Sequence, residues 1–296
     1  MSLVHRLRFF LRKFDLGFRP GDLVLDVGSG NDPHPRADLL CDKFVLDDSE
    51  REGRLVVDRP LIGGDLEALP LKSQSIDFVI ASHVLEHVKD PAVAIAELQR
   101  VAKRGYIETP AEFGGKLMDL PGHRWYVREE AGTLVFTGKS KGMFDDHLNG
   151  VCFGLWHQDK GYMQFFWNHL DLFFVRHRWE GRISHRVEPL AGELFEPETF
   201  FHSNVSEAGT TKATGASLKT RLKDGIRRYY QSPLYGPKRP VALRDLCACP
   251  RCHSPLEFEE HQVSCGACRL TFPMAKQGEA SVPMLLMDFV QQPVHS

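Results

Sequence analysis

The chain has 296 residues, of which 42% are hydrophobic and 26% charged, and its formal net charge is −2. These values are typical of a soluble globular protein and give no general attraction to nucleic acid or to membranes. No apolar run approaches the roughly 20 residues of a membrane span, and charges interrupt the N-terminus too often for a signal peptide. We therefore expect a cytoplasmic protein with one substantial core and a second, smaller unit.

The first predicted strand ends in a glycine turn. Residues 23–30 read Leu-Val-Leu-Asp-Val-Gly-Ser-Gly, so aliphatic side chains lead into Asp26, and Gly28 and Gly30 follow. The pattern predicts a buried strand that breaks into a tight turn, where missing side chains let backbone N–H groups approach a ligand. The turn by itself is a common pattern, and the residues that follow it decide what it means.

The link to the second strand is short. Pro33 and Pro35 precede the strand predicted over 37–42, so a full crossover helix cannot fit between the two strands. The helix N-terminus that usually lies beside such a glycine turn is therefore expected to be weak or absent. Asp42 ends this strand, where an acid usually accepts hydrogen bonds from ribose hydroxyls. Asp47 and Asp48 are the alternatives if the strand lies later.

The following elements alternate between strands and helical segments. Strands are predicted over 61–65, 76–81 and 106–110, and a helix begins at Asp90 and Pro91, an N-cap followed by a first-turn proline. This alternation predicts an α/β fold with a mostly parallel sheet, whose ligands bind at the carboxyl ends of the strands.

The segment 111–202 is rich in aromatic residues, most of which we expect in the core. Its first part, 111–165, is predicted to be an insertion on the substrate side. Alternating stretches over 172–179 and 183–187 predict an antiparallel pair of strands that turns at Glu180, Gly181 and Arg182.

The C-terminal part changes character. Small polar residues and then basic residues predict a flexible linker over 203–240. Five of the seven cysteines follow between Cys247 and Cys268. Two Cys-x-x-Cys knuckles match the ligands of a closed tetrahedral zinc site: Cys249, Cys252, Cys265 and Cys268. Zinc would then supply much of the folding free energy of a small β-rich domain over 241–296, with Cys247 as a spare.

The order of motifs over 20–112 resembles the class I S-adenosylmethionine-dependent methyltransferases. The motifs are Asp26-Val-Gly-Ser-Gly30, Asp42, Asp65-Leu-Glu-Ala-Leu-Pro70, and the strand ending at Ser82 and His83 before Leu85-Glu86-His87. The resemblance implies a Rossmann-like methyltransferase domain over 1–202. It also implies that S-adenosylmethionine contacts Asp26, Gly28, Gly30, Asp42, Asp65, Leu66 and Ser82.

In such an enzyme the methyl group is already activated, so the protein mainly aligns the acceptor with it. Where a general base is needed, the candidates are His83, His87 and His123. We favour His83, at a strand end, and His123, in a loop beyond the fifth strand. For His87 a structural hydrogen bond is the stronger alternative. Glu108, at the end of the fifth strand, is a further candidate for a substrate contact.

The tail has a resemblance of its own. Leu246-x-x-Cys-Pro-x-Cys, Pro255-Leu256, the second knuckle, Phe272-Pro273 and Val282-Pro283-Met-Leu-Leu286 are similar to the small zinc-ribbon activator subunit of certain RNA and protein methyltransferases. That subunit binds and stabilises a catalytic chain. Here the resemblance implies an intramolecular scaffold or a module that recruits substrate, and a partner protein bound through the ribbon stays an alternative.

Three functions compete at this point. The first is methyl transfer to a small molecule, lipid or glycan, and the second is methylation of RNA or a translation factor. Against the second, the chain has Ser82-His83-Val84-Leu85 where enzymes that methylate planar amides carry Asn/Asp-Pro-Pro-Tyr, so nucleic acid is not the favoured partner. The third is a cofactor-binding scaffold without turnover. The retained acids and glycines of the motifs argue against a pocket that has lost its function.

Overall fold

The computed structural model describes residues 16–48, 51, 53–120, 122–140, 143, 145–188, 225–226, 228–229, 232, 236 and 241–290. The linker predicted over 203–240 lies almost wholly outside them. The chain divides into two compact units. We call them the ribbon unit (Arg19–Ile80, Arg100–Lys103 and Phe201–Ser296) and the insertion unit (Met1–Phe18, Ala81–Gln99 and Arg104–Phe200).

The main sheet confirms the predicted α/β class. Its hydrogen-bonded strand order is β3-β2-β1-β4-β5-β8. The strands are β1 (Val24–Val27), β2 (Leu39–Asp42), β3 (Leu61–Gly63), β4 (Phe78–Ser82), β5 (Arg104–Pro110) and β8 (Phe174–Glu180). Strands β1, β2 and β3 pair in parallel, and β5 pairs antiparallel with β8. Helix α2 (Pro91–Val101) begins at the predicted first-turn proline.

In the ribbon unit, β1, β2 and β3 are buried along their whole length. Strands covered on both faces need apolar side chains at successive positions rather than at alternate ones. The pairs Leu25–Leu39 and Leu40–Leu61 meet this need. The acids Asp26 and Asp42 interrupt the apolar runs near the carboxyl ends of β1 and β2.

No helix connects β1 to β2, as the prolines predict. Gly28 and Gly30 both take positive φ, 68° and 50°, which a glycine adopts without the steric cost of a Cβ. The buried Arg36 stabilises the rest of the link, because its guanidinium donates to Asp38 Oδ2 at 2.6 Å and to the Asp22 carbonyl at 2.5 Å.

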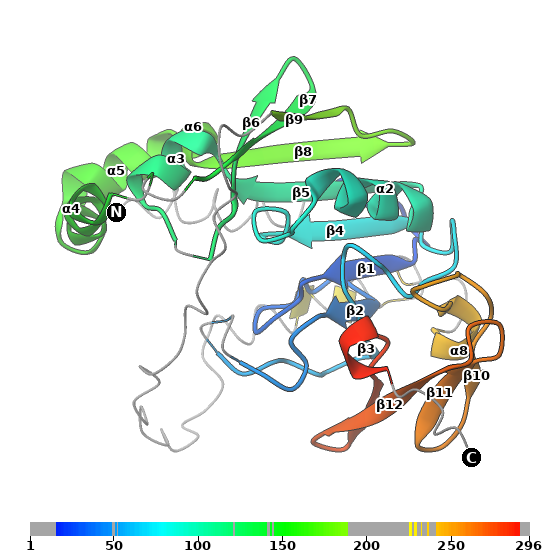
Figure 1. Ribbon diagram of the computed structural model, residues 1–296. Coiled ribbons are helices and arrows are strands. Elements are labelled where there is room, and N and C mark those ends of the chain that lie inside the picture. Colours follow the sequence, from blue (N-terminus) through cyan, green and yellow to red (C-terminus); the bar gives the residue numbers. More distant parts are fainter. Residues whose placement is uncertain are drawn as a thin grey trace. The chain divides into compact units, whose positions relative to one another are not determined.

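The ribbon itself is a four-stranded antiparallel sheet of order β10-β11-β12-β13. Its elements are α8 (Leu243–Leu246), β10 (Glu257–Phe258), β11 (Gln262–Cys265), β12 (Leu270–Gln277), β13 (Ala280–Pro283) and the 3₁₀ helix η1 (Met287–Phe289). In Figure 1 these elements run from orange to red.

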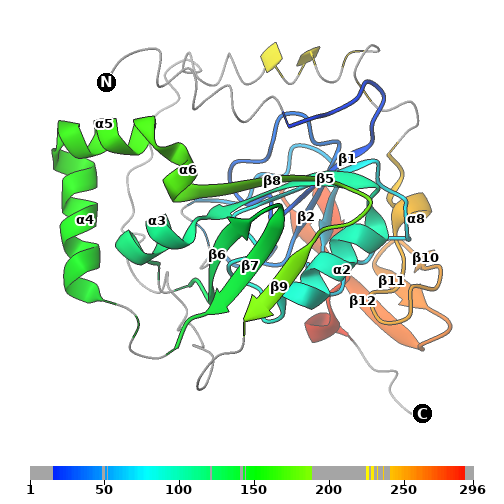
Figure 2. The same cartoon turned by 90° about the horizontal axis from the view of Figure 1, so that it is seen from above.

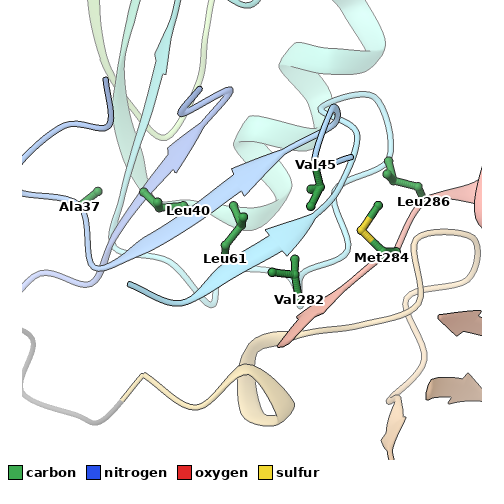
Figure 3. Close-up of a cluster of buried hydrophobic side chains, with 7 residues drawn as sticks. All are labelled: Ala37, Leu40, Val45, Leu61, Val282, Met284 and Leu286. Atoms are coloured by element: carbon green, nitrogen blue, oxygen red, sulfur yellow. The ribbon is translucent and has the colours of Figure 1, made fainter. Parts of the chain in front are cut away.

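The ribbon packs on the edge of the parallel strands within the same unit. Met284, directly after β13, forms a parallel bridge with Gly63 at the end of β3. Both parts contribute to one apolar cluster that includes Met284 (Figure 3). The cluster consists of Ala37, Leu40, Val45, Leu61, Val282, Met284 and Leu286. Backbone hydrogen bonds add to it: Lys72 N donates to Leu246 O at 2.8 Å and Ala248 N donates to Pro70 O at 3.0 Å.

In the insertion unit, three further strands form a second sheet of order β6-β7-β9. These are β6 (Trp125–Glu130), β7 (Thr133–Gly138) and β9 (His185–Glu188). The predicted pairing of 172–179 with 183–187 is therefore wrong. Strand β8 pairs with β5, while β9 pairs in parallel with β7. The alternation identified two strands, but the partner of β9 lies some 50 residues away in the chain, beyond the reach of a local pattern.

Helices of this unit lie to one side of the second sheet (Figure 2): α3 (Glu112–Leu117), α4 (Asp146–Gln158), α5 (Lys160–Asn168) and α6 (Leu170–Phe173). Asp145 and Asp159 cap α4 and α5, because their side chains accept from the Leu148 and Tyr162 amides. Phe166 and Phe173 are buried between the helices, as predicted for the aromatics, whereas Phe165 is 38% exposed. No helix in the described part of the chain combines the length and apolar character needed to cross a bilayer.

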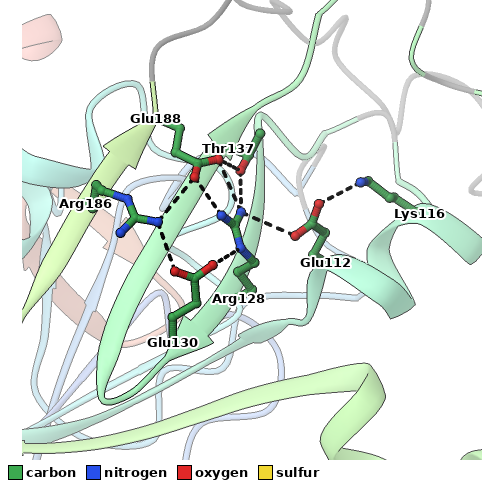
Figure 4. A network of polar contacts seen from close by, with 7 residues as sticks. All are labelled: Glu112, Lys116, Arg128, Glu130, Thr137, Arg186 and Glu188. Carbon is green, nitrogen blue, oxygen red and sulfur yellow. Dashed lines mark hydrogen bonds and ion pairs between the residues drawn. The ribbon is translucent and has the colours of Figure 1, made fainter.

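An ionic network centred on Arg128 joins α3 to the second sheet (Figure 4). The Arg128 guanidinium contacts Glu188 Oε1 at 2.6 Å, Glu130 Oε1 at 2.7 Å and Thr137 Oγ1 at 2.8 Å. The hydrogen bonds that Glu188 accepts from Arg128 and from Thr137 lower the pKa of Glu188 to about 2. One arginine thus connects β6, β7 and β9 through their side chains.

Candidate functional site

The glycine turn is held by the end of β2. The Gly28 amide donates to the Cys41 carbonyl at 2.8 Å, and the Gly30 amide donates to Asp42 Oδ2 at 2.9 Å. Between them, the Ser29 side-chain hydroxyl is buried and has no hydrogen-bond partner among the described residues. An unsatisfied buried hydroxyl in such a turn is the kind of group that a bound ligand completes.

The Asp42 carboxylate makes more contacts than the sequence indicated. Besides the Gly30 amide, its carboxylate accepts from the Phe44 amide at 2.9 Å and lies 3.3 Å from Arg51 Nη2. Arg51 also donates to the backbone carbonyls of Phe44 and Asp47. Asp42 therefore shapes the glycine turn directly, and Arg51 is a neighbour of this carboxylate that motif reading missed.

Asp26 is buried below the turn, where its Oδ2 accepts from the His34 amide at 2.7 Å. Burial raises the pKa of Asp26 to about 7, and the nearby Asp42 and Asp32 carboxylates add to this effect. The carboxyl group therefore titrates near neutrality. A neutral carboxyl and a carboxylate can both accept the His34 hydrogen bond, so the turn does not require the charge.

Asp65 and Leu66 follow β3 at the same edge. The Asp65 carboxylate accepts from the Glu67 amide at 3.0 Å and pairs with Lys43 Nζ at 2.6 Å. The Gly64 amide donates to the Asp42 carbonyl at 3.0 Å, which joins this loop to the end of β2. The ribbon unit thus collects six of the seven predicted cofactor residues at the carboxyl ends of three parallel strands: Asp26, Gly28, Gly30, Asp42, Asp65 and Leu66.

The seventh residue, Ser82, ends β4 in the insertion unit and precedes His83. His83 has a φ of 58°, in the left-handed region, and its amide donates to the Glu108 carbonyl at 2.8 Å. The ring nitrogens lie 3.3 Å from Glu86 Oε1 and 3.6 Å from Glu108 Oε1. Glu108 in turn accepts from the Tyr106 hydroxyl at 2.5 Å.

These carboxylates determine the charge of His83. Burial opposes its cationic form, but hydrogen bonds to Glu108 and Glu86 outweigh that effect and raise the pKa of His83 to about 9. The ring is then protonated at neutral pH, where it can donate hydrogen bonds or stabilise negative charge. A protonated ring cannot accept a proton, so a role as general base requires that the ring first lose this proton.

His123 has the opposite character. It lies in the loop before β6 and its side chain is buried. Burial lowers the pKa of His123 to about 3, and the positive charge of the buried Lys139 contributes to the shift. The ring is therefore neutral at physiological pH, with one nitrogen free to accept a bond. Its ring centroid lies 4.8 Å from that of His87, a proximity across 36 residues of chain that the motifs did not reveal.

Glu86 has no predicted role, although it stands in the motif Leu85-Glu86-His87. Its side chain is buried, yet its pKa is lowered. Burial favours the neutral acid, but the hydrogen bond from His83 and the charges of neighbouring histidines favour the carboxylate. The spacing His-x-x-Glu-His is the signal from which this residue could have been found.

The four knuckle cysteines converge as predicted. The sulfur atoms of Cys249, Cys252, Cys265 and Cys268 all lie within 4.8 Å of one another, and Cys247 is outside this group. A tetrahedral zinc with Zn–S bonds of about 2.3 Å separates its sulfur ligands by about 3.8 Å, so the arrangement fits zinc. The residue after each knuckle, His253 or Arg269, has a positive φ that turns the chain back.

Sequence comparisons identify the class of the N-terminal domain. Residues 25–107 match the family described as "Methyltransferase domain". A demethylmenaquinone methyltransferase of Renibacterium salmoninarum is 41% identical over 106 residues, which cover 33% of this chain and 44% of that protein. An uncharacterized transposon protein of Streptomyces fradiae is 37% identical over 106 residues, or 30% of each chain.

Residues 25–107 therefore match a methyltransferase domain, in agreement with the motifs. The chain spans less than half the length of either curated relative. Among solved structures, a possible histamine N-methyltransferase of Thermotoga maritima has 22% identity, covers 38% of this chain and 56% of its own, and gives a TM-score of 0.29. A complex of the Haloferax volcanii Trm112 methyltransferase activator with a putative methyltransferase gives 16% identity, 42% and 69% coverage, and a TM-score of 0.31.

Proposed function

We propose that this protein transfers a methyl group from S-adenosylmethionine to a small-molecule acceptor. One observation carries the proposal. Asp26, the glycine turn, Asp42 and Asp65 lie together at the carboxyl ends of β1, β2 and β3. These strands belong to the segment that matches a methyltransferase domain. In open α/β sheets this edge is where ligands bind. The unpartnered Ser29 hydroxyl in the turn fits a bound cofactor.

When bound, S-adenosylmethionine supplies an activated methyl group, and the protein has to hold and orient the reactants. The glycine turn and Ser29 would hold the methionine part, Asp42 the ribose, and Asp65 with the Leu66 backbone the adenine. His83, held by Glu86 and Glu108, would donate hydrogen bonds or stabilise negative charge on the acceptor side.

For the acceptor, a small molecule is favoured over RNA or a translation factor. The Renibacterium relative is named for a quinone substrate, and the chain lacks the Asn/Asp-Pro-Pro-Tyr element that suits planar amides. A small aromatic acceptor, with demethylmenaquinone as the first compound to test, is therefore the working hypothesis. Lipids and glycans are next in the screen.

For the ribbon, we propose a zinc-dependent intramolecular scaffold over 241–296 that supports the methyltransferase domain. Its contacts fall on the segment that carries the adenine-binding residues: Met284 pairs with Gly63, and Leu246 and Ala248 bond to Lys72 and Pro70. These contacts bracket the Asp65–Pro70 element on both sides. A partner protein is not needed to cover this edge, because the chain covers it itself.

The proposal is tested by calorimetric titration of the zinc-loaded protein with S-adenosylmethionine and its demethylated product. We expect micromolar binding by the wild type and loss of binding in Gly28→Val and Asp65→Ala, while Gly154→Ala, a change on the surface of α4, binds normally. Absence of binding by folded wild-type protein would refute methyl transfer. Binding without turnover on any acceptor, together with a copurifying protein, would favour the scaffold alternative.

A further inference from the structure

Three side chains converge within the insertion unit, outside the predicted cofactor residues. Glu86 and His87 lie in the turn that follows β4, and His123 lies in the loop that precedes β6. One potential ligand atom of each residue lies within 4.8 Å of the other two. The cluster therefore brings two imidazoles and a carboxylate to one point.

The carboxylate of this cluster lacks sufficient partners. The Glu86 side chain is 1% exposed, and its Oε1 lies 3.3 Å from His83 Nδ1. Its Oε2 accepts no hydrogen bond from any residue that the structure describes. A buried carboxylate oxygen without a partner is costly, so a cation or a hydrogen-bond donor at this oxygen would stabilise it.

The tautomer of His87 suits a metal ligand. His87 Nδ1 lies 3.0 Å from the Gly122 carbonyl oxygen. A carbonyl only accepts hydrogen bonds, so Nδ1 carries the proton and Nε2 keeps its lone pair. A ring nitrogen bonded to a backbone carbonyl, with the other nitrogen free, is the usual arrangement of a metal-ligating histidine. His87 is exposed whereas Glu86 and His123 are buried, which gives an ion a path from solvent.

We propose that Glu86, His87 and His123 bind one divalent transition-metal ion. Two imidazole nitrogens and one carboxylate oxygen are a donor set for iron, manganese, cobalt or zinc rather than for calcium or magnesium, which prefer oxygen ligands alone. Three protein ligands leave coordination positions open for water or for an oxygen atom of a bound molecule. This site is separate from the four-thiolate site of the ribbon, and its existence does not depend on the proposed methyl transfer.

The test uses the full chain with zinc already bound in the ribbon. Mn²⁺ is titrated and the loss of its free-ion electron paramagnetic resonance signal is measured. Co²⁺ is then added to a second sample and followed by absorption. Thiolate ligands give cobalt an intense sulfur-to-metal charge-transfer band, whereas nitrogen and oxygen ligands give only weak visible bands, so the spectrum separates the two sites.

The variants are His87→Ala and Glu86→Gln, with His157→Ala, an exposed histidine of α4, as the matched control. We expect one Mn²⁺ per wild-type chain, weak cobalt bands without sulfur character, and at least a tenfold loss of affinity in both cluster variants but not in the control. His87 is exposed, so His87→Ala carries the test even if Glu86→Gln fails to fold. No binding by the wild type, or equal binding by wild type and His87→Ala, would overturn the proposal.

Discussion

Met284 and Gly63 form a parallel backbone bridge between the C-terminal ribbon and the edge strand β3. A Cβ at position 63 would lie 3.0 Å from Met284 Sδ and 3.2 Å from Met284 Cα. Because Cα is backbone, it cannot swing away as a side-chain end can. The glycine is thus needed for close approach of two backbones, not for an unusual φ.

The first prediction follows from this contact. Gly63→Val should separate Met284 from β3 and lower the free energy of unfolding by about 1–3 kcal/mol, the usual cost of an overpacked core position. Urea denaturation measures the change. Gly154→Ala is the control, because no atom lies within 4 Å of a Cβ there and alanine favours a helix. Equal stability of Gly63→Val and wild type would show that the ribbon contact adapts without cost.

The second prediction concerns pH and Asp26. Its pKa is raised from 3.8 to about 7 in the folded protein, so between these values the folded state binds a proton that the unfolded chain has released. The free energy of unfolding should therefore fall as pH rises through this window. Asp26→Asn should remove that part of the slope.

Denaturation with urea at several pH values across this window measures both slopes. Asp288→Asn, at an exposed position of η1, controls for the substitution itself and should keep the wild-type slope. If Asp26→Asn and wild type show the same dependence on pH, the carboxyl group is already ionised throughout the range, and burial does not govern it.

The third prediction separates the ligand cysteines from their neighbour. Cys252→Ser removes one of four converging thiols and should weaken the metal site strongly, and with it the fold of the ribbon. Cys247→Ser should keep the site intact, since Cys247 lies outside the group. The sulfur-to-cobalt charge-transfer band of cobalt-substituted protein reports on this site. An unchanged band in Cys252→Ser would exclude a four-thiolate site.

The fourth prediction concerns Arg128, which bonds to Glu130, Thr137 and Glu188 on three strands. Arg128→Gln should loosen β9, because β9 is an edge strand that pairs only with β7 in its sheet. The amide of Arg186, which faces β7 in this parallel register, should then exchange its hydrogen faster. The global effect should stay near or below about 1 kcal/mol, because the network is partly exposed.

Hydrogen-exchange measurements on the intact protein test this, with Arg176→Gln as the control. Arg176 is on β8 and pairs with Asp171 rather than with this network. If exchange of the Arg186 amide does not change in Arg128→Gln, backbone pairing alone holds β9 in place.

The comparison of sequence and structure shows where local patterns suffice. Apolar runs placed the parallel strands, Pro33 and Pro35 excluded a helix between β1 and β2, and the knuckle spacing selected the four cysteines that converge. Each of these features is set by residues close together in the chain. Strand β9 was assigned the wrong partner, because the alternation of side chains identifies a strand but not the strand beside which it lies.

The candidate site divides in the same way. The sequence by itself indicated the glycine-turn motifs, the four cysteines that converge and the α/β class, because each depends on short spacing and local backbone geometry. Only the tertiary structure decided that Met284 approaches Gly63, that His123 meets Glu86 and His87, and that Asp26 and His83 have raised pKa values. These properties arise from burial and from contacts between distant segments, and no local pattern encodes them.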